Sequence, residues 1–200
     1  MTVSIEATSK KYHGRKAATY ETVRTKQKRW HRENELVEEF LQGKKLGRVL
    51  DIPVGTGRFL RLYNHMNATA VDGIDSSDEM LALAAKKLKR LHRAPLVALL
   101  KGDARKVARA DRYYDTTVCV RFLDLIDEEA MRTVVKELCR VTKNQIVLTI
   151  RFGPKYLPKS NTAEHDERKF KALISKQGWH IARAEPIRDA GWHVLSLERK

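Results

Sequence analysis

Cysteine is scarce in this sequence: only Cys119 and Cys139 occur, and neither stands in a spacing typical of metal ligands. Both are flanked by apolar residues, so we expect reduced core residues and no disulfide framework. No apolar run approaches the roughly 20 residues that a transmembrane helix needs. The first residues also lack the apolar core of a signal peptide. These absences favour a soluble, cytoplasmic protein without a membrane partner.

Acidic residues are few relative to basic ones: 25 Asp and Glu stand against 40 Lys and Arg, for a net charge of +15. The excess is concentrated in two stretches, Lys10–Arg32 and Lys86–Arg112. A positive field of this size favours anionic partners through steering and counterion release. Basic stretches are also common on solvated helix faces. Charge alone therefore leaves a nucleic-acid or phosphorylated partner as one of two interpretations.

No linker rich in Gly, Ser or Pro divides the 200 residues. Residues 1–46 are predicted to be a basic N-terminal extension with two helices, at about Ala17 to Trp30 and about Asn34 to Gln42. From residue 47 to residue 200 strand-like and helix-like patterns alternate, which predicts a parallel sheet. The last two strands have no helix between them, which predicts an antiparallel hairpin.

The predicted fold class is therefore α/β: a doubly wound, mostly parallel seven-stranded sheet with helices on both faces and a terminal antiparallel hairpin. The strands are predicted at Arg48–Ile52, Thr69–Asp75, Leu96–Lys101, Thr116–Val120, Gln145–Arg151, Trp179–Glu185 and His193–Arg199.

Helix starts are marked by capping residues. Ser76 with Glu79 three residues later forms a capping box, which predicts Ser76 as the N-cap of a helix after the second strand. Asp127 is predicted to cap a second helix, and a third is expected from about Glu167 to Lys176.

A Gly-Thr-Gly turn follows the first predicted strand, and a helix-like pattern resumes at once. Such a turn lets the backbone approach a nucleotide-like ligand at the carboxyl end of the strand. A dinucleotide site typically has a third glycine, but Leu60 stands at that position. No Gly-Lys-Ser/Thr occurs, which excludes a Walker-type triphosphate site.

Four segments in order resemble the successive motifs of class I S-adenosylmethionine (SAM)-dependent methyltransferases, over about residues 48–200. They are Val49-Leu-Asp-Ile-Pro-Val-Gly-Thr-Gly57, Gly73-Ile-Asp-Ser-Ser-Asp-Glu-Met-Leu81, Lys101-Gly-Asp-Ala104 and Tyr114-Asp-Thr-Thr-Val-Cys-Val-Arg121. Many members of the family have glycine where this chain has Pro53, which has no N–H to offer a ligand.

The resemblance implies a SAM site. It places Asp51 and the Gly55-Thr56-Gly57 backbone against the amino-acid part of SAM, and Asp75 at the ribose hydroxyls. It places Ser76 and Met80 at the border of the adenine, with Asp103 accepting from the adenine amino group and Ala104 beside it. It also implies that Val120, Arg121 and Phe122 line the methyl-transfer chamber, and that the N-terminal extension covers the mouth of the active site.

Arg121 interrupts an apolar strand end, where an unpaired buried charge is costly. We expect a carboxylate partner, either Asp124, Asp127 or a group on a ligand. Because SAM carries its own activated methyl group, a base is needed only when the acceptor must lose a proton. Arg121 and Tyr20 are the catalytic candidates, with Arg24 and His165 as further residues for positioning or proton handling.

The leading hypothesis is a SAM-dependent methyltransferase that acts on a small, anionic acceptor. The alternatives are a methyltransferase acting on RNA or DNA through the two basic stretches, and a non-catalytic module that binds SAM or nucleic acid. The sequence lacks the Asn/Asp-Pro-Pro-Tyr type of tetrapeptide and a Pro-Cys pair, which weakens the nucleic-acid hypothesis. The oligomeric state is left open.

Overall fold

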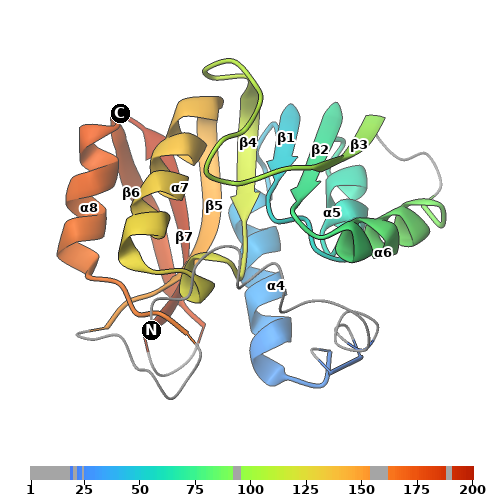
Figure 1. Ribbon diagram of the computed structural model, residues 1–200, viewed down its shortest axis with the longest axis horizontal. Coiled ribbons are helices and arrows are strands. Elements are labelled where there is room, and N and C mark those ends of the chain that lie inside the picture. Colours follow the sequence, from blue (N-terminus) through green and yellow to red (C-terminus); the bar gives the residue numbers. More distant parts are fainter. Residues whose placement is uncertain (1–18, 20–21, 24, 92–95, 154–161, 188–190) are drawn as a thin grey trace.

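The computed structural model describes residues 19, 22–23, 25–91, 96–153, 162–187 and 191–200. Their centre is one seven-stranded sheet with the order β3-β2-β1-β4-β5-β7-β6 (Figure 1). The strands are β1 (Arg48–Asp51), β2 (Ala70–Asp75), β3 (Leu96–Lys101), β4 (Tyr114–Cys119), β5 (Thr142–Arg151), β6 (Trp179–Pro186) and β7 (Trp192–Arg199).

Strands β3, β2, β1, β4 and β5 are parallel, so their carboxyl ends meet at one edge of the sheet. Val49 pairs with both Val71 and Thr116, which places β1 at the centre of this parallel part. The inner strands are buried on both faces, and this explains their nearly continuous apolar runs.

The last two strands form the predicted antiparallel hairpin. Strand β7 inserts between β5 and β6 and is antiparallel to both. Arg151 at the end of β5 is thereby paired in register with Trp192 at the start of β7. The fold class predicted from the sequence is confirmed.

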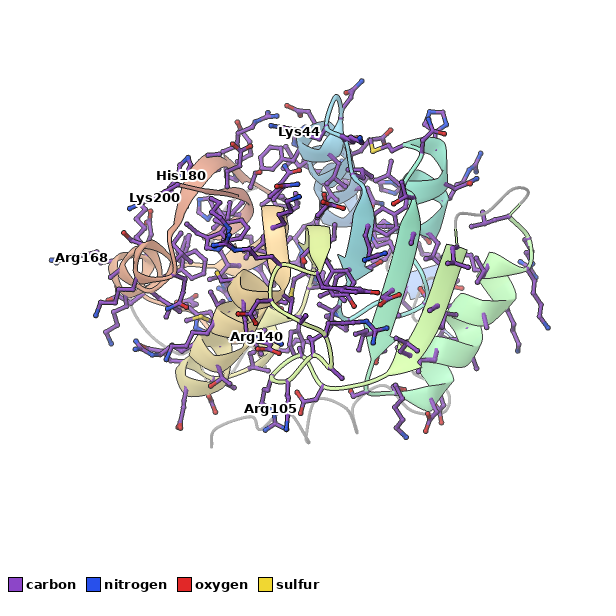
Figure 2. The ribbon with its side chains drawn as sticks, turned by 90° about the horizontal axis from the view of Figure 1, so that it is seen from above. Lys44, Arg105, Arg140, Arg168, His180 and Lys200 are labelled. Atoms are coloured by element: carbon purple, nitrogen blue, oxygen red, sulfur yellow. The ribbon has the colours of Figure 1, made fainter. Side chains whose placement is uncertain are left out.

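Helices cover both faces of the sheet. They are α4 (Lys28–Leu41), α5 (Leu60–His65), α6 (Asp78–Leu88), α7 (Glu128–Val141) and α8 (Glu167–Lys176), with a short 3-10 helix, η1, at Leu123–Leu125. Helices α7 and α8 pack on one face, whereas α4 and α5 lie on the other (Figures 1 and 2). Ala84 of α6 joins the apolar cluster of α4 and α5.

Two local predictions are wrong. Helix α4 runs without a break from Lys28 to Leu41, where two helices were expected with a gap after Trp30. The N-cap of α6 is Ser77 and not Ser76, because the Ser77 hydroxyl accepts a hydrogen bond from Met80 N at 3.3 Å. The capping pattern indicated the right turn but misplaced the cap by one residue, because Ser occupies both positions.

The predictions for α7, for α8 and for the burial of the two cysteines are confirmed. Asp127 caps α7 by accepting from Ala130 N at 2.8 Å, and α8 has the expected bounds. Cys119 and Cys139 are free and buried. Among the described residues, none of the helices is long and apolar enough to cross a bilayer. In that same part of the chain, no group of three or more His, Cys, Asp or Glu residues is placed to hold a metal ion.

Helix α4 belongs to the core, although it precedes the first strand. Leu36, Val37, Phe40 and Leu41 are buried in one cluster with Val49 of β1. The helix presents an apolar face at the expected spacing, and burying this face fixes it against the sheet. Its first turn therefore has a rigid position relative to the carboxyl edge of the strands.

The packing of α4 gives a first testable prediction. Leu36 is fully buried, so Leu36→Ala should lower the free energy of unfolding by about 2–5 kcal/mol through lost burial and a residual cavity. Val23→Ala, which shortens a largely exposed side chain, is the control and should change it by no more than about 0.5 kcal/mol. Urea unfolding measures both. Equal, small effects would mean that α4 is not part of the cooperative core.

Candidate active site

A cavity opens at the carboxyl edge of the sheet, where the strand order reverses between β1 and β4. This switch point is where open α/β sheets bind ligands. About 980 Å³ there is not filled by atoms, part of it open to solvent. A concave site with apolar walls and a few polar groups suits a small-molecule ligand.

Nearly all the residues that the sequence predicts for the cofactor line this one cavity. They are Asp51, Gly55, Thr56, Asp75, Ser76, Met80, Asp103, Ala104 and Val120. Gly57 is the one that does not. The cavity continues to Arg121, Phe122 and Leu125 beyond β4, and Trp30 of α4 forms part of its wall.

The two glycines of the turn serve different purposes. Gly55 has φ +53° on the cavity wall, and a Cβ there would meet nothing within 4 Å. Gly57 has φ +74°, and a Cβ there would lie 2.7 Å from Leu60 Cδ1 and 3.3 Å from Ala84 Cα. Gly57 is therefore required by the close packing of the turn against α5 and α6.

Asp75, at the end of β2, joins the two turns that border the cavity. Its carboxylate accepts from Gly55 N at 2.8 Å and from Ser77 N at 2.9 Å. Burial raises the pKa of Asp75 above its ordinary value, and the backbone hydrogen bonds from Ser77 and Gly55 oppose that rise. Each carboxylate oxygen keeps acceptor capacity after one such bond.

Asp51, at the end of β1, is a buried acid whose Oδ2 has no hydrogen-bond partner. Burial raises the pKa of this carboxyl to about 8. The Tyr63 hydroxyl and Arg58 lower it, while the charge of Asp75 raises it further. A cationic donor in the cavity would satisfy the orphaned oxygen and favour its ionised form.

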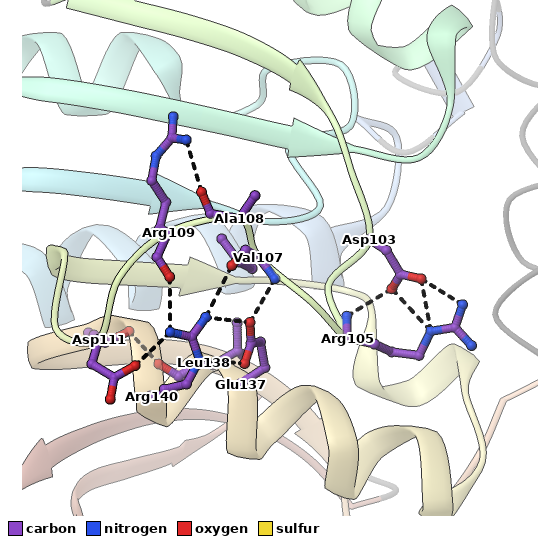
Figure 3. A network of polar contacts seen from close by, with 10 residues as sticks. Asp103, Arg105, Val107, Ala108, Arg109, Asp111, Glu137, Leu138 and Arg140 are labelled. Atoms are coloured by element: carbon purple, nitrogen blue, oxygen red, sulfur yellow. Dashed lines mark hydrogen bonds and ion pairs between the residues drawn. The ribbon is translucent and has the colours of Figure 1, made fainter.

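Asp103 lies on the opposite wall, after β3 (Figure 3). Its carboxylate accepts from Arg105 N at 2.8 Å and from the Arg105 guanidinium at 2.6 Å. Partial burial raises the pKa of Asp103, but the hydrogen bonds from Arg105 outweigh this and hold it below its ordinary value. The side chain is thus an ionised, oriented acceptor at the cavity.

The same segment is tied to α7 behind the cavity. Arg140 bridges Glu137 and Asp111 and donates to the carbonyl oxygens of Val107 and Arg109 (Figure 3). This network fixes the course of the chain between β3 and β4, and with it the position of Asp103.

Arg121 follows β4 in a left-handed conformation, with φ +61°. Such strain in a residue other than glycine is typical of functional positions. Its N–H donates to Thr149 Oγ1 at 2.7 Å, and its guanidinium lies over the Trp192 ring at 4.6 Å. Arg121 Nη1 is buried and has no hydrogen-bond partner.

The charge partner of Arg121 is Glu33 of α4, which the sequence analysis missed. Glu33 is 1% exposed and lies 3.8 Å from Arg121 and 2.5 Å from Arg58. The sequence holds one sign of this buried acid: Glu33 occupies a position on the apolar face of α4, between Trp30 and Val37. Asp124, one of the expected partners, is buried with Oδ1 unpaired, and burial raises its pKa while Arg121 lowers it.

Arg58 fastens α4 to the turn after β1, a contact that the sequence did not reveal. Its guanidinium donates to Glu33, to Asn34 Oδ1 at 2.5 Å and to the Trp30 carbonyl oxygen at 3.1 Å. It also stacks 3.5 Å from the Trp30 ring centroid. Trp30 is thereby held against the cavity.

Three further candidates for positioning or proton handling remain. Tyr20 and Arg24 lie outside the described residues. His165 is buried away from the cavity wall, with Nε2 at 2.7 Å from the Leu123 carbonyl oxygen, and burial lowers its pKa.

Comparisons with known proteins agree with this geometry. Residues 49–145 match the family model described as a methyltransferase domain. The chain is 34% identical over 136 residues to a phosphatidylethanolamine N-methyltransferase of Cereibacter sphaeroides, covering 67% of this chain and 63% of that protein. It is 43% identical over 82 residues to a ribosomal protein uL3 glutamine methyltransferase of Xanthomonas campestris, covering 40% of this chain and 26% of that protein.

Among solved structures, magnesium protoporphyrin IX methyltransferase from Synechocystis with bound SAH (S-adenosylhomocysteine) has the same fold. Its TM-score is 0.73 at 19% identity, covering 85% of this chain and 84% of that one. The matched region and the fold are those of class I SAM-dependent methyltransferases. It spans less than two thirds of the length of the two curated relatives, so its own activity and substrate are taken up below as proposals.

The two glycines provide a matched pair of variants. Gly57→Ala should lower the free energy of unfolding by more than about 2 kcal/mol, because left-handed strain is joined by contacts that must shift. Gly55→Ala meets open space and should cost about 1 kcal/mol from strain alone. Urea unfolding measures the free energy of unfolding of both variants. A larger loss for Gly55→Ala would contradict the assignment of Gly57 to packing.

Proposed function

We propose that this protein transfers a methyl group from SAM to a small acceptor that carries an anionic group. The observation that carries the proposal is the single cavity with two chemically different halves. Acidic side chains and an open glycine turn line one half, whereas Arg121, Phe122 and Trp30 line the other.

The residues of the first half fit SAM. The orphaned Asp51 Oδ2 suits the ammonium of its amino-acid part, and the Asp75 carboxylate has spare acceptor capacity for a ribose diol. The ionised Asp103 suits an amino group on a base, with Met80 as an apolar neighbour. When bound, SAM supplies an activated methyl group, so the protein needs no strong nucleophile of its own.

The second half would orient the acceptor and exclude water. Trp30, Phe122 and Leu125 provide apolar walls, and Arg58 keeps Trp30 in place. Among the described residues, no histidine lines the cavity. This favours an acceptor atom that attacks without prior removal of its proton by a histidine base. We assign acceptor positioning to Arg121; a role for Tyr20 stays a prediction.

The charge balance of this half supports an anionic acceptor. Arg58 and Arg121 line the cavity, and Arg29 and Arg151 lie near the same Trp192 ring as Arg121. Within the described part of the chain, Glu33 pairs with Arg58 and Arg121, and Glu164 pairs with Arg151. Asp124 is a further buried acid near this half, where burial raises its pKa and the charges of Arg121 and Arg29 lower it. The net positive charge favours binding of an anion.

A nucleic-acid acceptor is the second candidate, favoured by the net charge of +15. Within the stretch Lys86–Arg112, however, Lys101, Arg105 and Arg109 are paired with Asp78, Asp103 and Asp72. Basic residues such as Lys44, Arg105, Arg168 and Lys200 lie at separate places around the molecule (Figure 2). Retention on RNA that falls steeply with salt would favour this candidate over a small acceptor. Cytoplasmic location stays a prediction, supported by two free, buried cysteines.

The cofactor assignment predicts a pH dependence of SAH binding. The ammonium of SAH favours ionised Asp51, whose pKa is about 8 in the free protein. Below that pH the carboxyl must release a proton on binding, so affinity should rise by up to about tenfold per pH unit as pH increases toward 8. Calorimetric titration in two buffers of different ionisation enthalpy measures both affinity and proton release.

Asp51→Asn is the matched variant, because it keeps the shape and removes the titrating group. It should bind SAH more weakly, with no proton release and a flat pH dependence in this range. NADH is the control ligand and should not bind. Absence of SAH binding to the unmodified protein would refute the proposed function, and pH-independent binding would refute the role of Asp51.

A further inference from the structure

Three guanidinium groups surround one indole beside the second half of the cavity. Arg29 and Arg121 each lie 4.6 Å from the Trp192 ring centroid, and Arg151 lies 5.9 Å from it. They come from α4, from the segment after β4 and from the end of β5. We call these four residues the Trp192 cage.

The cage is fixed by the sheet and the core. Trp192 is 4% exposed and pairs in register with Arg151. Arg151 is fully engaged: its guanidinium donates to Thr162 Oγ1 at 2.7 Å and pairs with Glu164 at 2.7 Å. Arg121 is tied to β5 through Thr149. The cage is therefore rigid on the side of β5 and β7.

The Arg121 guanidinium is farther from its carboxylate partner than the Arg151 guanidinium is from Glu164. An aromatic face attracts a cation, but it does not replace the hydrogen bonds that a guanidinium gives to an anion. Arg121 Nη1 is buried without a hydrogen-bond acceptor, and its nearest carboxylate oxygen, on Glu33, is 3.8 Å away. A buried charged donor without a hydrogen-bond acceptor is costly, and among the described residues none accepts from Arg121 Nη1, although Glu33 and Asp124 offset its charge.

We infer that the Trp192 cage is the binding site for a carboxylate or phosphate group of the acceptor, with Arg121 and Arg29 as its ligands and Glu33 as the residue that positions Arg121. Arg121 also lines the cavity, so an anion bound there belongs to a molecule that reaches the methyl-transfer chamber. Trp192 is the aromatic ring that both guanidinium groups contact. The inference rests on the proposed function and adds the residues that would recognise the acceptor.

The role of Glu33 follows from its two contacts. Its carboxylate is anchored by the short ion pair to Arg58, which leaves Oε2 directed at Arg121 at a longer distance. This arrangement orients the Arg121 guanidinium without occupying its Nη1 donor. Arg58 adjoins the glycine turn, so Glu33 also connects the cofactor half of the cavity with the cage.

The experiment uses the full chain saturated with SAH and titrated with inorganic phosphate, and separately with acetate, at constant ionic strength with chloride as the balancing anion. Tryptophan fluorescence and calorimetry report binding. We expect saturable binding of at least one anion at millimolar concentration, and the preferred anion tells phosphate from carboxylate. Arg121→Gln and Arg29→Gln should each weaken it about tenfold or more, because each removes charged hydrogen bonds.

Two variants serve as controls. Arg132→Gln makes the same charge change at an exposed position of α7 and should leave the anion affinity unchanged. Trp192→Phe keeps an aromatic face and assigns the spectroscopic signal: it should abolish the fluorescence change, while calorimetry measures anion binding independently. Because Arg29 is only half buried, Arg29→Gln remains informative if Arg121→Gln fails to fold.

Two results would overturn the inference. One is the absence of saturable anion binding to a protein that binds SAH, which leaves the proposed function standing. The other is equal weakening by Arg29→Gln and Arg132→Gln, which would mean general electrostatic attraction. Failure to bind SAH at all is a different outcome and counts against the proposed function itself.

Discussion

The Asp75 carboxylate is the constraint on which the cofactor half of the cavity depends. It accepts hydrogen bonds from the backbone of Gly55 and of Ser77, and so fixes the turn after β1 against the start of α6. Neither turn is regular secondary structure, so the bridge adds to the few hydrogen bonds that hold each turn next to an open cavity. Asp51 and the open surface at Gly55 then line the cavity in a fixed relation.

Much of the fold could be predicted because it depends on local patterns. The inner strands show as apolar runs, α8 shows as a periodic stripe that stops at Gly178, and the final hairpin shows as two strands without a helix. The cap of α6 was misplaced because two adjacent serines satisfy the same pattern. The break predicted within α4 did not occur, because packing of Leu36, Phe40 and Leu41 on the sheet favours one continuous helix.

Only the first half of the cavity, which lies directly after the strand ends, could be predicted from the sequence. The acids and glycines of the first half follow strands directly, so a motif reveals them. The second half is built by contacts between distant segments. Glu33 meets Arg58 and Arg121, and Arg29 meets Trp192, across separations that no local pattern encodes. An acid on the apolar face of α4 and an arginine at an apolar strand end were the visible signs, and only the fold connects them.

The N-terminal helix thus contributes in two ways. Its apolar face completes the core, and its first turn brings Arg29, Trp30 and Glu33 to the carboxyl edge of the sheet. The strained backbone of Arg121 is maintained between this helix and β5, through Glu33 on one side and Thr149 on the other. Stability of the core and shape of the acceptor half are therefore coupled through α4.

A crystal structure of the protein with SAH tests the central claim most directly. The account predicts SAH at the carboxyl edge, with its ammonium at Asp51, its ribose at Asp75 and its base amino group at Asp103. The sulfur should face the half of the cavity formed by Arg121 and Phe122. Density for SAH elsewhere on the molecule, or a ligand turned so that its sulfur faces away from Arg121, would contradict the account.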